Sequence, residues 1–315
     1  MRRVGPTVCA LLVLAVAALL LPVAPSLSQS RSPFVHTRVL YVPSAAGGPS
    51  ERVLVSWPRR AGGRDTPAGG RWPILVALHG AREAALPPRR AILAWSVDYH
   101  LDAALGALAR GRLTRADFGG LVTDRRLGAI NAQLAARTFR GLFVVTPYTP
   151  NLLAQGSGSQ ALRSYGDWLS GPLLRAVREA FPAATDVAGT GIDGVSLGGR
   201  LALEVGLAHP ETFGAVGALQ PAIDEAAITA LVGAALSRPT ASAQRLRIVT
   251  SDGDGGLAAA RALSSSLRAA RVQHDLLVAT GTHGYEFNRG PGALEMLLFH
   301  DAALAEELVT SASAH

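Results

Sequence analysis

The feature that most constrains the fold of this 315-residue chain is the alternation of short apolar runs with segments of helical periodicity, which begins at residue 74. The run ILVAL at 74–78 is apolar throughout, which is typical of a strand covered on both faces. Similar runs follow at 142–146, 187–192, 215–219, 246–250 and 275–278. Helical patterns occur at 168–181, 198–208, 225–236, 257–270 and 292–308. This order predicts an α/β fold with a mostly parallel central sheet flanked by helices.

Two more strands are predicted before this alternation, and one connection within it is unusually long. Residues 35–42 and 52–57 have strand character, whereas 57–73 is a loop rich in Gly, Arg and Pro. Segment 81–140 contains about 60 mostly helical residues where one crossover helix would suffice. We interpret it as a helical insertion that forms a lid or pocket wall. The alternative is an enlarged crossover with no role in binding.

The N-terminus has the pattern of a secretory signal peptide. Arg2 and Arg3 precede an apolar stretch at 8–21, and small, turn-forming residues follow it. Cleavage after Ser26 and cleavage after Ser28 both fit the small-x-small preference. The apolar stretch is shorter than the ~20 residues that span a bilayer, which disfavours an uncleaved anchor. We therefore predict a signal peptide at 1–28, a folded domain at 29–315, export to the periplasm or the extracellular space, and no stable membrane span after cleavage.

The composition excludes several classes of protein. Apolar residues make up 49% of the chain and charged residues 17%, so a disordered chain is excluded. The net charge is +7, but all 30 basic residues are arginines and they are scattered, so we predict no nucleic-acid partner. Cys9 is the only cysteine, and signal cleavage would remove it together with any disulfide or thiolate nucleophile. No cluster of side chains has metal-ligand spacing, and neither a metal nor an organic cofactor is predicted.

The sharpest local motif is Gly194-Val195-Ser196-Leu197-Gly198. It follows an apolar strand and opens a helical segment, which is the context of a G-x-S-x-G nucleophile elbow. A serine in such a sharp turn needs neighbours without side chains two positions away on either side. The helix that starts there directs its N-terminal N–H groups toward the reacting centre. The motif predicts that Ser196 is a catalytic nucleophile.

A serine hydroxyl needs a base to remove its proton, and the base needs an acid to orient it. Of the eight histidines, His283 lies in a loop directly after the last apolar run, where the base is expected. The turn after 246–250 offers two acids, Asp252 and Asp254. Asp254 lies 58 residues after Ser196 and 29 before His283, and this spacing favours it. Asp252 is kept as the alternative acid, because Asp is also common in turns for structural reasons.

Hydrolysis of this kind also needs two backbone N–H groups that bind the developing oxyanion. The N–H of Leu197, next to the nucleophile, is one candidate. Ala81, after the sequence His79-Gly80, is the other, because Gly80 permits close approach of the backbone. We interpret His79 as a structural histidine.

These residues together resemble the α/β-hydrolase fold, and within it the putative-esterase family, in which enterochelin esterases, feruloyl esterases and S-formylglutathione hydrolase are similar members. The resemblance covers 74–299, except for the unmatched segment 81–140. It rests on LHG at 78–80, YGDWL at 165–169, GVSLGG at 194–199, PETF at 210–213 and RALSSSLRAARV at 261–272. At the acid position, Ser251 stands where a glycine is usual in the family.

The resemblance implies an α/β-hydrolase domain at 29–315 with 81–140 as a helical insertion or lid. It further implies a serine hydrolase that cleaves a carboxylic ester through an acyl-enzyme on Ser196, with Asp254 and His283 completing the triad and no cofactor. With the signal peptide, the prediction is an exported enzyme. The expected substrate is a small-molecule or polymer-linked ester. Two alternatives stay open, namely an acyltransferase or serine peptidase with the same triad, and a non-catalytic exported binding protein of the same fold.

Overall fold

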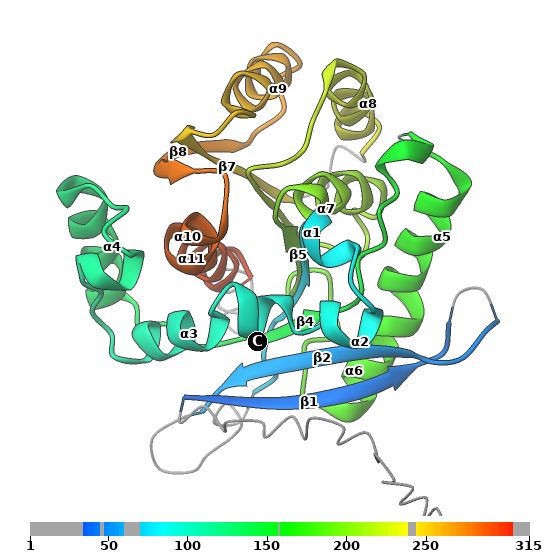
Figure 1. Cartoon of the computed structure of the whole chain (residues 1–315), viewed down its shortest axis with the longest axis horizontal. Helices are drawn as coiled ribbons and strands as arrows, with labels where there is room; N and C mark the ends of the chain where they lie inside the picture. The colour runs from blue at the N-terminus through cyan, green and yellow to red at the C-terminus, as the bar shows by residue number, and fades with distance from the viewer. Residues whose placement is uncertain (1–33, 45–46, 60–69, 157, 239–243, 305–315) are drawn as a thin grey trace, which may run out of the picture. The chain divides into compact units, whose positions relative to one another are not determined.

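The computed structural model describes residues 34–44, 47–59, 70–156, 158–238 and 244–304. The predicted signal peptide at 1–28 and most of the predicted loop at 57–73 lie outside the described residues. The strands of the described part form one sheet in the order β1-β2-β4-β3-β5-β6-β7-β8 (Figure 1). They are β1 (Val35–Val42), β2 (Glu51–Pro58), β3 (Ile74–Leu78), β4 (Phe143–Thr146), β5 (Thr190–Gly194), β6 (Ala215–Leu219), β7 (Arg245–Gly253) and β8 (Asp275–Thr282).

The strands from β4 to β8 pair in parallel, whereas β1 and β2 form an antiparallel hairpin whose second strand pairs with β4. The predicted mostly parallel sheet is therefore confirmed. Because parallel strands point the same way, their carboxyl ends lie along one edge of the sheet. The segments that follow β3, β5, β6, β7 and β8 meet at this edge. They carry the predicted site residues except Asp252, which lies at the end of β7.

Helices cover both faces of the sheet and bury two separate apolar layers (Figure 1). One face is covered by α5 (Gln160–Trp168), α6 (Leu174–Ala180), α7 (Leu197–Ala208), α8 (Glu225–Leu236) and α9 (Leu257–Ala269), and the other by α3 (Leu101–Ala109), α4 (Asp124–Ala136) and α11 (Ala293–Ala303). Successive residues of β3 alternate between the two layers: Ile74 and Val76 pack in the first layer, and Leu75 and Ala77 pack in the second. All of β3 is buried, which is why its sequence is apolar throughout.

Segment 81–140 is helical, as expected, and packs closely onto the rest of the domain. It contains α1 (Ala81–Ala84), α2 (Pro88–Ala91), a π-turn at Ala94–Asp98, α3, a short 3₁₀ helix at Arg115–Phe118, and α4. The buried face of α3 belongs to the second apolar layer. The α4 helix is joined to α11 by Arg126, which donates to Glu295 at 2.7 Å, and by Arg137, which donates to Asp301 at 3.0 Å.

Several elements differ from the sequence-based expectation. The strands predicted at 246–250 and 275–278 extend to Gly253 and Thr282. The strand predicted at 187–192 begins at Thr190, because Asp186 accepts a hydrogen bond from Gly189 N and closes a turn over the preceding residues. The helix predicted at 168–181 begins at Gln160 and passes through a π-turn that contains Pro172. After His283, α10 (Tyr285–Phe287) and a π-turn continue directly into α11, so helical structure starts before the predicted residue 292.

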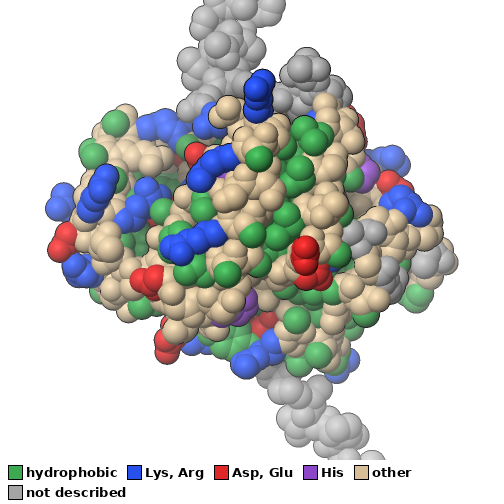
Figure 2. Space-filling model, turned by 90° about the horizontal axis from the view of Figure 1, so that it is seen from above, with side chains coloured by type: hydrophobic (Ala, Val, Ile, Leu, Met, Phe, Trp, Pro, Cys, Tyr) green, Lys and Arg blue, Asp and Glu red, His purple; other side chains and the backbone are tan. Residues whose placement is uncertain are grey.

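On the face that Figure 2 shows, charged side chains are distributed rather than gathered in one patch. Figure 2 shows arginine side chains spread singly over one face, with apolar, neutral and acidic side chains between them. Among the described residues, no helix is both long and apolar enough to cross a membrane.

We predict that the Arg126–Glu295–Arg247 cluster contributes strongly to stability. Glu295 is 1% exposed and accepts hydrogen bonds from both arginines, so Glu295→Ala leaves buried Arg247 without its carboxylate. We expect the free energy of unfolding to fall by about 3–5 kcal/mol in urea denaturation. Asp124→Asn, which removes an exposed ion pair with Arg115, serves as the control and is expected to cost less than ~1 kcal/mol. Equal losses for the two variants would contradict the prediction.

Candidate active site

Ser196 lies in a sharp turn between β5 and α7 and has a strained backbone. Its φ is 56° and its ψ is −113°, a conformation that residues with a side chain rarely adopt. A Cβ atom on Gly194 would collide with the backbone of Gly198, and one on Gly198 would lie 2.5 Å from Leu78 O. Both glycines of the motif are therefore required sterically, as the predicted elbow demands.

Backbone hydrogen bonds to the neighbouring strands hold the elbow in place. Val195 N donates to Leu78 O at 3.2 Å on the β3 side, and Ser196 N donates to Leu219 O at 2.9 Å on the β6 side. Ala222 N donates to Ser196 O at 3.0 Å. Because the N–H and the C=O of Ser196 are both hydrogen-bonded, its backbone conformation is fixed, and only its side chain can rotate.

His283 and Asp254 are in direct contact. His283 Nδ1 lies 3.0 Å from Asp254 Oδ1, and the carboxylate also accepts hydrogen bonds from Thr250 Oγ1 at 2.7 Å and from Gly256 N at 2.9 Å. Burial alone would raise the pKa of Asp254, but these three donors outweigh it and the pKa is lowered. An ionised carboxylate only accepts, so Nδ1 carries the proton and Nε2 has its lone pair available.

The alternative acid, Asp252, does not contact the imidazole. Its Oδ1 accepts a hydrogen bond from Gly281 N at 3.0 Å, and its side chain is exposed. Asp252 thus fixes the start of the loop that carries His283, whereas Asp254 holds the imidazole itself. The two acids that the sequence left open have separate positions and separate partners.

Gln220 is a residue of the site that sequence reasoning missed. It follows β6, has a φ of 43° and is 1% exposed. Its Nε2 donates to Ser251 Oγ at 2.7 Å and to Thr282 O at 3.1 Å, so one side-chain amide joins the carboxyl ends of β7 and β8 next to His283. A polar residue directly after the apolar run at 215–219 was the signal that could have identified it.

The turn after β3 packs against the elbow. A Cβ atom on Gly198 would lie 2.6 Å from His79 O, so the turn and the first residues of α7 are in close contact. Leu197 is the first residue of α7 and Ala81 is the first residue of α1, so both candidate oxyanion N–H groups are at helix starts.

His79 has a structural environment, as expected. It is fully buried; Nε2 accepts from Thr149 N at 2.9 Å, and Nδ1 donates to Gly80 O at 3.1 Å. Burial lowers the pKa of His79, which agrees with a neutral imidazole that donates from one nitrogen and accepts at the other.

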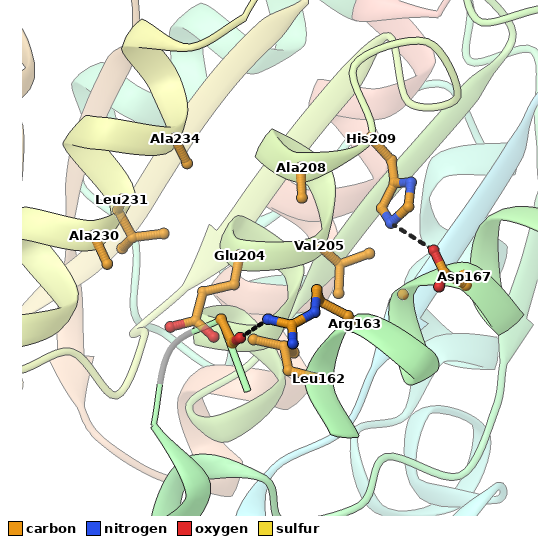
Figure 3. A pocket seen from close by; sticks show the side chains of 12 residues that line it. Leu162, Arg163, Asp167, Glu204, Val205, Ala208, His209, Ala230, Leu231 and Ala234 are labelled. Atoms are coloured by element: carbon orange, nitrogen blue, oxygen red, sulfur yellow. Dashed lines mark hydrogen bonds and ion pairs between the residues drawn. The ribbon is translucent and has the colours of Figure 1, made fainter. Parts of the chain in front are cut away.

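A cavity of about 410 Å³ lies elsewhere, between α5, α7 and α8 (Figure 3). Apolar side chains such as Leu162 and Leu231 line it, and at one end His209 Nε2 lies 3.8 Å from Asp167 Oδ1. None of the candidate catalytic residues is among the described residues that line this cavity. It is therefore separate from the site at the carboxyl edge of the sheet.

The fold and this strand-end site define an α/β-hydrolase. A family model described as "Putative esterase" matches residues 149–287, a segment that includes Ser196, Asp254 and His283. The chain is thus an ester hydrolase that resembles the putative-esterase family over this segment, and the predicted fold and class of enzyme are confirmed. Among the described residues, no group of three His, Cys, Asp or Glu side chains is arranged to hold a metal ion.

Solved structures of similar fold include an esterase and two hydrolases. A ferulic acid esterase matches with a TM-score of 0.58 and 16% identity, over 86% of this chain and 98% of that one. S-formylglutathione hydrolase (FrmB) from Staphylococcus aureus matches with a TM-score of 0.54 and 14% identity, over 85% and 96%. The enterobactin and salmochelin hydrolase IroE matches with a TM-score of 0.52 and 17% identity, over 88% and 99%. At these identities the likeness shows the fold, and no curated protein sequence matches the chain.

The two acids are predicted to differ sharply in their effect on activity. Asp254→Asn replaces the acceptor at His283 Nδ1 with an amide and disturbs the tautomer, so we expect kcat/KM for a p-nitrophenyl ester to fall by about 10³-fold or more. Asp252→Asn, the matched control, keeps an acceptor oxygen for Gly281 N and is expected to cost less than about 10-fold. A larger loss for Asp252→Asn would exchange the two assignments.

Proposed function

We propose that this protein is an exported serine esterase that cleaves a carboxylic ester through an acyl-enzyme on Ser196. The observation that carries the proposal is the strained serine at the strand-to-helix elbow, with a carboxylate-bound imidazole on the loops that follow β7 and β8 at the same sheet edge. The family match supports ester hydrolysis as the reaction.

In the first step, Ser196 Oγ attacks the ester carbonyl while His283 Nε2 takes its proton. Asp254 holds the imidazole in the tautomer that leaves Nε2 unprotonated, and it stabilises the imidazolium that forms. Because the pKa of Asp254 is lowered by its three hydrogen-bond donors against the effect of burial, this carboxylate is ionised at neutral pH. His283 then gives the proton to the leaving alcohol, and Ser196 carries the acyl group.

The tetrahedral intermediate would be held by the N–H groups of Leu197 and Ala81. Each is the first residue of a helix, so its N–H lacks an intrahelical acceptor and is available to an oxyanion. In α7 the twelve-residue helix adds the positive end of its dipole at the same place. Water, activated by His283, then attacks the acyl carbonyl and releases the acid.

Segment 81–140 is proposed to act as a pocket wall beside this site within the hydrolase domain at 29–315. Two cavities of about 480 and 490 Å³ are lined in part by this segment, and Leu121 borders both. The same Leu121 approaches Gly281, where a Cβ atom would lie 3.3 Å from its Cδ1, next to the loop that carries His283. The substrate that we propose is a small-molecule or polymer-linked ester, in line with the complex of a structurally similar esterase with ferulic acid.

Covalent labelling tests the proposed nucleophile. A fluorophosphonate probe phosphonylates an activated serine, so we expect the wild-type chain to be labelled and Ser196→Ala to be unlabelled and without esterase activity. Ser170→Ala is the matched control, because Ser170 lies on a different segment and its hydroxyl donates to Asp167 O; it is expected to label like the wild type. A folded wild-type chain that is neither labelled nor active would overturn the proposal.

Export is tested by the N-terminus of the processed chain. Expression of the full sequence in a secreting bacterial host is expected to deliver a chain outside the cytoplasm that begins at residue 27 or 29. Mass spectrometry of the intact protein determines which of the two it is. Replacement of Leu12 and Leu14 by Arg, which interrupts the apolar stretch, is expected to retain the chain in the cytoplasm. An unprocessed, retained wild-type chain would contradict the proposal of export.

A further inference from the structure

A buried carboxylate lies directly behind the candidate oxyanion turn and takes no part in the steps above. Glu83, in α1, is 1% exposed. Tyr99 Oη donates to its Oε2 at 2.5 Å, and Tyr285 Oη donates to its Oε1 at 2.6 Å. The two hydroxyls come from segments that are far apart in the sequence, so the carboxylate joins three parts of the chain.

One branch of this network reaches the turn that contains Ala81. Gly80 N donates to Tyr99 Oη at 3.1 Å, and a Cβ atom on Gly80 would lie 3.4 Å from Glu83 Oε2. Gly80 N–H is therefore engaged with Tyr99, which fixes the orientation of the peptide group directly before the one that contains Ala81 N. Burial, followed by the charge of Glu83, raises the pKa of Tyr99, so its hydroxyl keeps the proton that it donates.

The other branch reaches the loop that carries His283. Glycines at 281 and 284 flank this histidine, and Gly281 has a φ of 135°, so the loop backbone has little intrinsic stiffness. Asp252 and Gln220 hold its first half. Tyr285, two residues after His283, holds its second half through Glu83, and the guanidinium carbons of Arg82 and Arg289 lie 4.9 and 5.2 Å from its ring centroid.

We propose that Glu83 is a positioning residue, which locks the oxyanion turn to the histidine loop through Tyr99 and Tyr285. The oxyanion turn and the histidine loop are far apart in the sequence, and this carboxylate accepts from Tyr99, which bonds to the turn, and from Tyr285, which follows His283. Since Glu83 is buried, it acts through these tyrosines and not by contact with a substrate. The inference rests on the proposed function, because it concerns the geometry of that same reaction.

The test compares Glu83→Gln, Tyr285→Phe and the double variant. In Glu83→Gln, an uncharged amide with one acceptor oxygen replaces the two carboxylate oxygens that accept from the tyrosine hydroxyls. In Tyr285→Phe the donating hydroxyl is absent. Each variant therefore breaks or weakens the contact between residues 83 and 285. For each single variant we expect kcat for a p-nitrophenyl ester to fall about 10-fold, with KM changed less than about threefold. The affinity for a boronic acid, which forms a tetrahedral adduct on serine, should fall in parallel with kcat.

The double variant separates a shared contact from two independent effects. If Glu83 and Tyr285 act through one hydrogen bond, the double variant should lose no more than about threefold beyond the worse single variant, whereas independent roles predict a loss of about 100-fold. Tyr165→Phe is the control, since it removes a buried hydroxyl that donates to Tyr148 O, and it is expected to keep kcat and boronate affinity.

Two outcomes would overturn the inference. One is a Tyr285→Phe enzyme with kcat and boronate affinity like those of Tyr165→Phe, and the other is a double variant with a 100-fold loss. Tyr285 is only partly buried, so this variant remains informative if Glu83→Gln fails to fold. Failure of the proposed function is distinguishable, because it would appear in the wild-type chain as absent labelling, or as activity that survives Ser196→Ala.

Discussion

Close contact between the turn after β3 and the first residues of α7 is the constraint on which the site depends. A side chain at Gly198 would meet Leu78 O and His79 O at 2.5 and 2.6 Å, so the two backbones touch. This approach places the turn that precedes α1 against the start of α7, and Ser196 in the elbow has a strained φ of 56°. Such strain costs about 1–3 kcal/mol. Hydrogen bonds from Val195 N and Ser196 N to the flanking strands help to offset it.

The parallel sheet supplies the remaining groups from the same edge. Asp254 follows β7 and His283 follows β8. Because these strands are neighbours in the sheet, the loops that follow them are adjacent and the two side chains are in contact. Gln220 joins both strand ends by its amide. Beneath the elbow, buried Asp193 of β5 contacts His300 Nε2 of α11 at 3.0 Å, which ties the strand before Ser196 to the helix layer on one face. The strand ends that carry the candidate catalytic residues are thus bonded to one another and to the helix layer.

Much of this arrangement could be predicted from the sequence, because apolar runs and glycine spacing report directly on burial and on steric limits. The strand at 74–78 and the helix at 225–236 have the observed bounds, and the elbow motif located Ser196. Spacing favoured Asp254 over Asp252 but left both open, since two acids in one strand-end turn differ only in the direction of their side chains. The late start of β5 followed from a side-chain bond by Asp186, which a search for apolar runs does not detect.

Contacts between distant polar residues were beyond prediction, because a single sequence does not indicate which buried charges pair. Glu83 and Tyr285 are 202 positions apart, and Arg126 and Glu295 are 169 apart. Both contacts join segment 81–140 to the C-terminal part of the chain, one near its start and one in α4. Apolar packing alone places helices in a layer and permits sliding, whereas directional bonds to buried carboxylates specify their position. These contacts therefore favour a fixed pocket wall over a moving lid, and that is the role we propose for the segment.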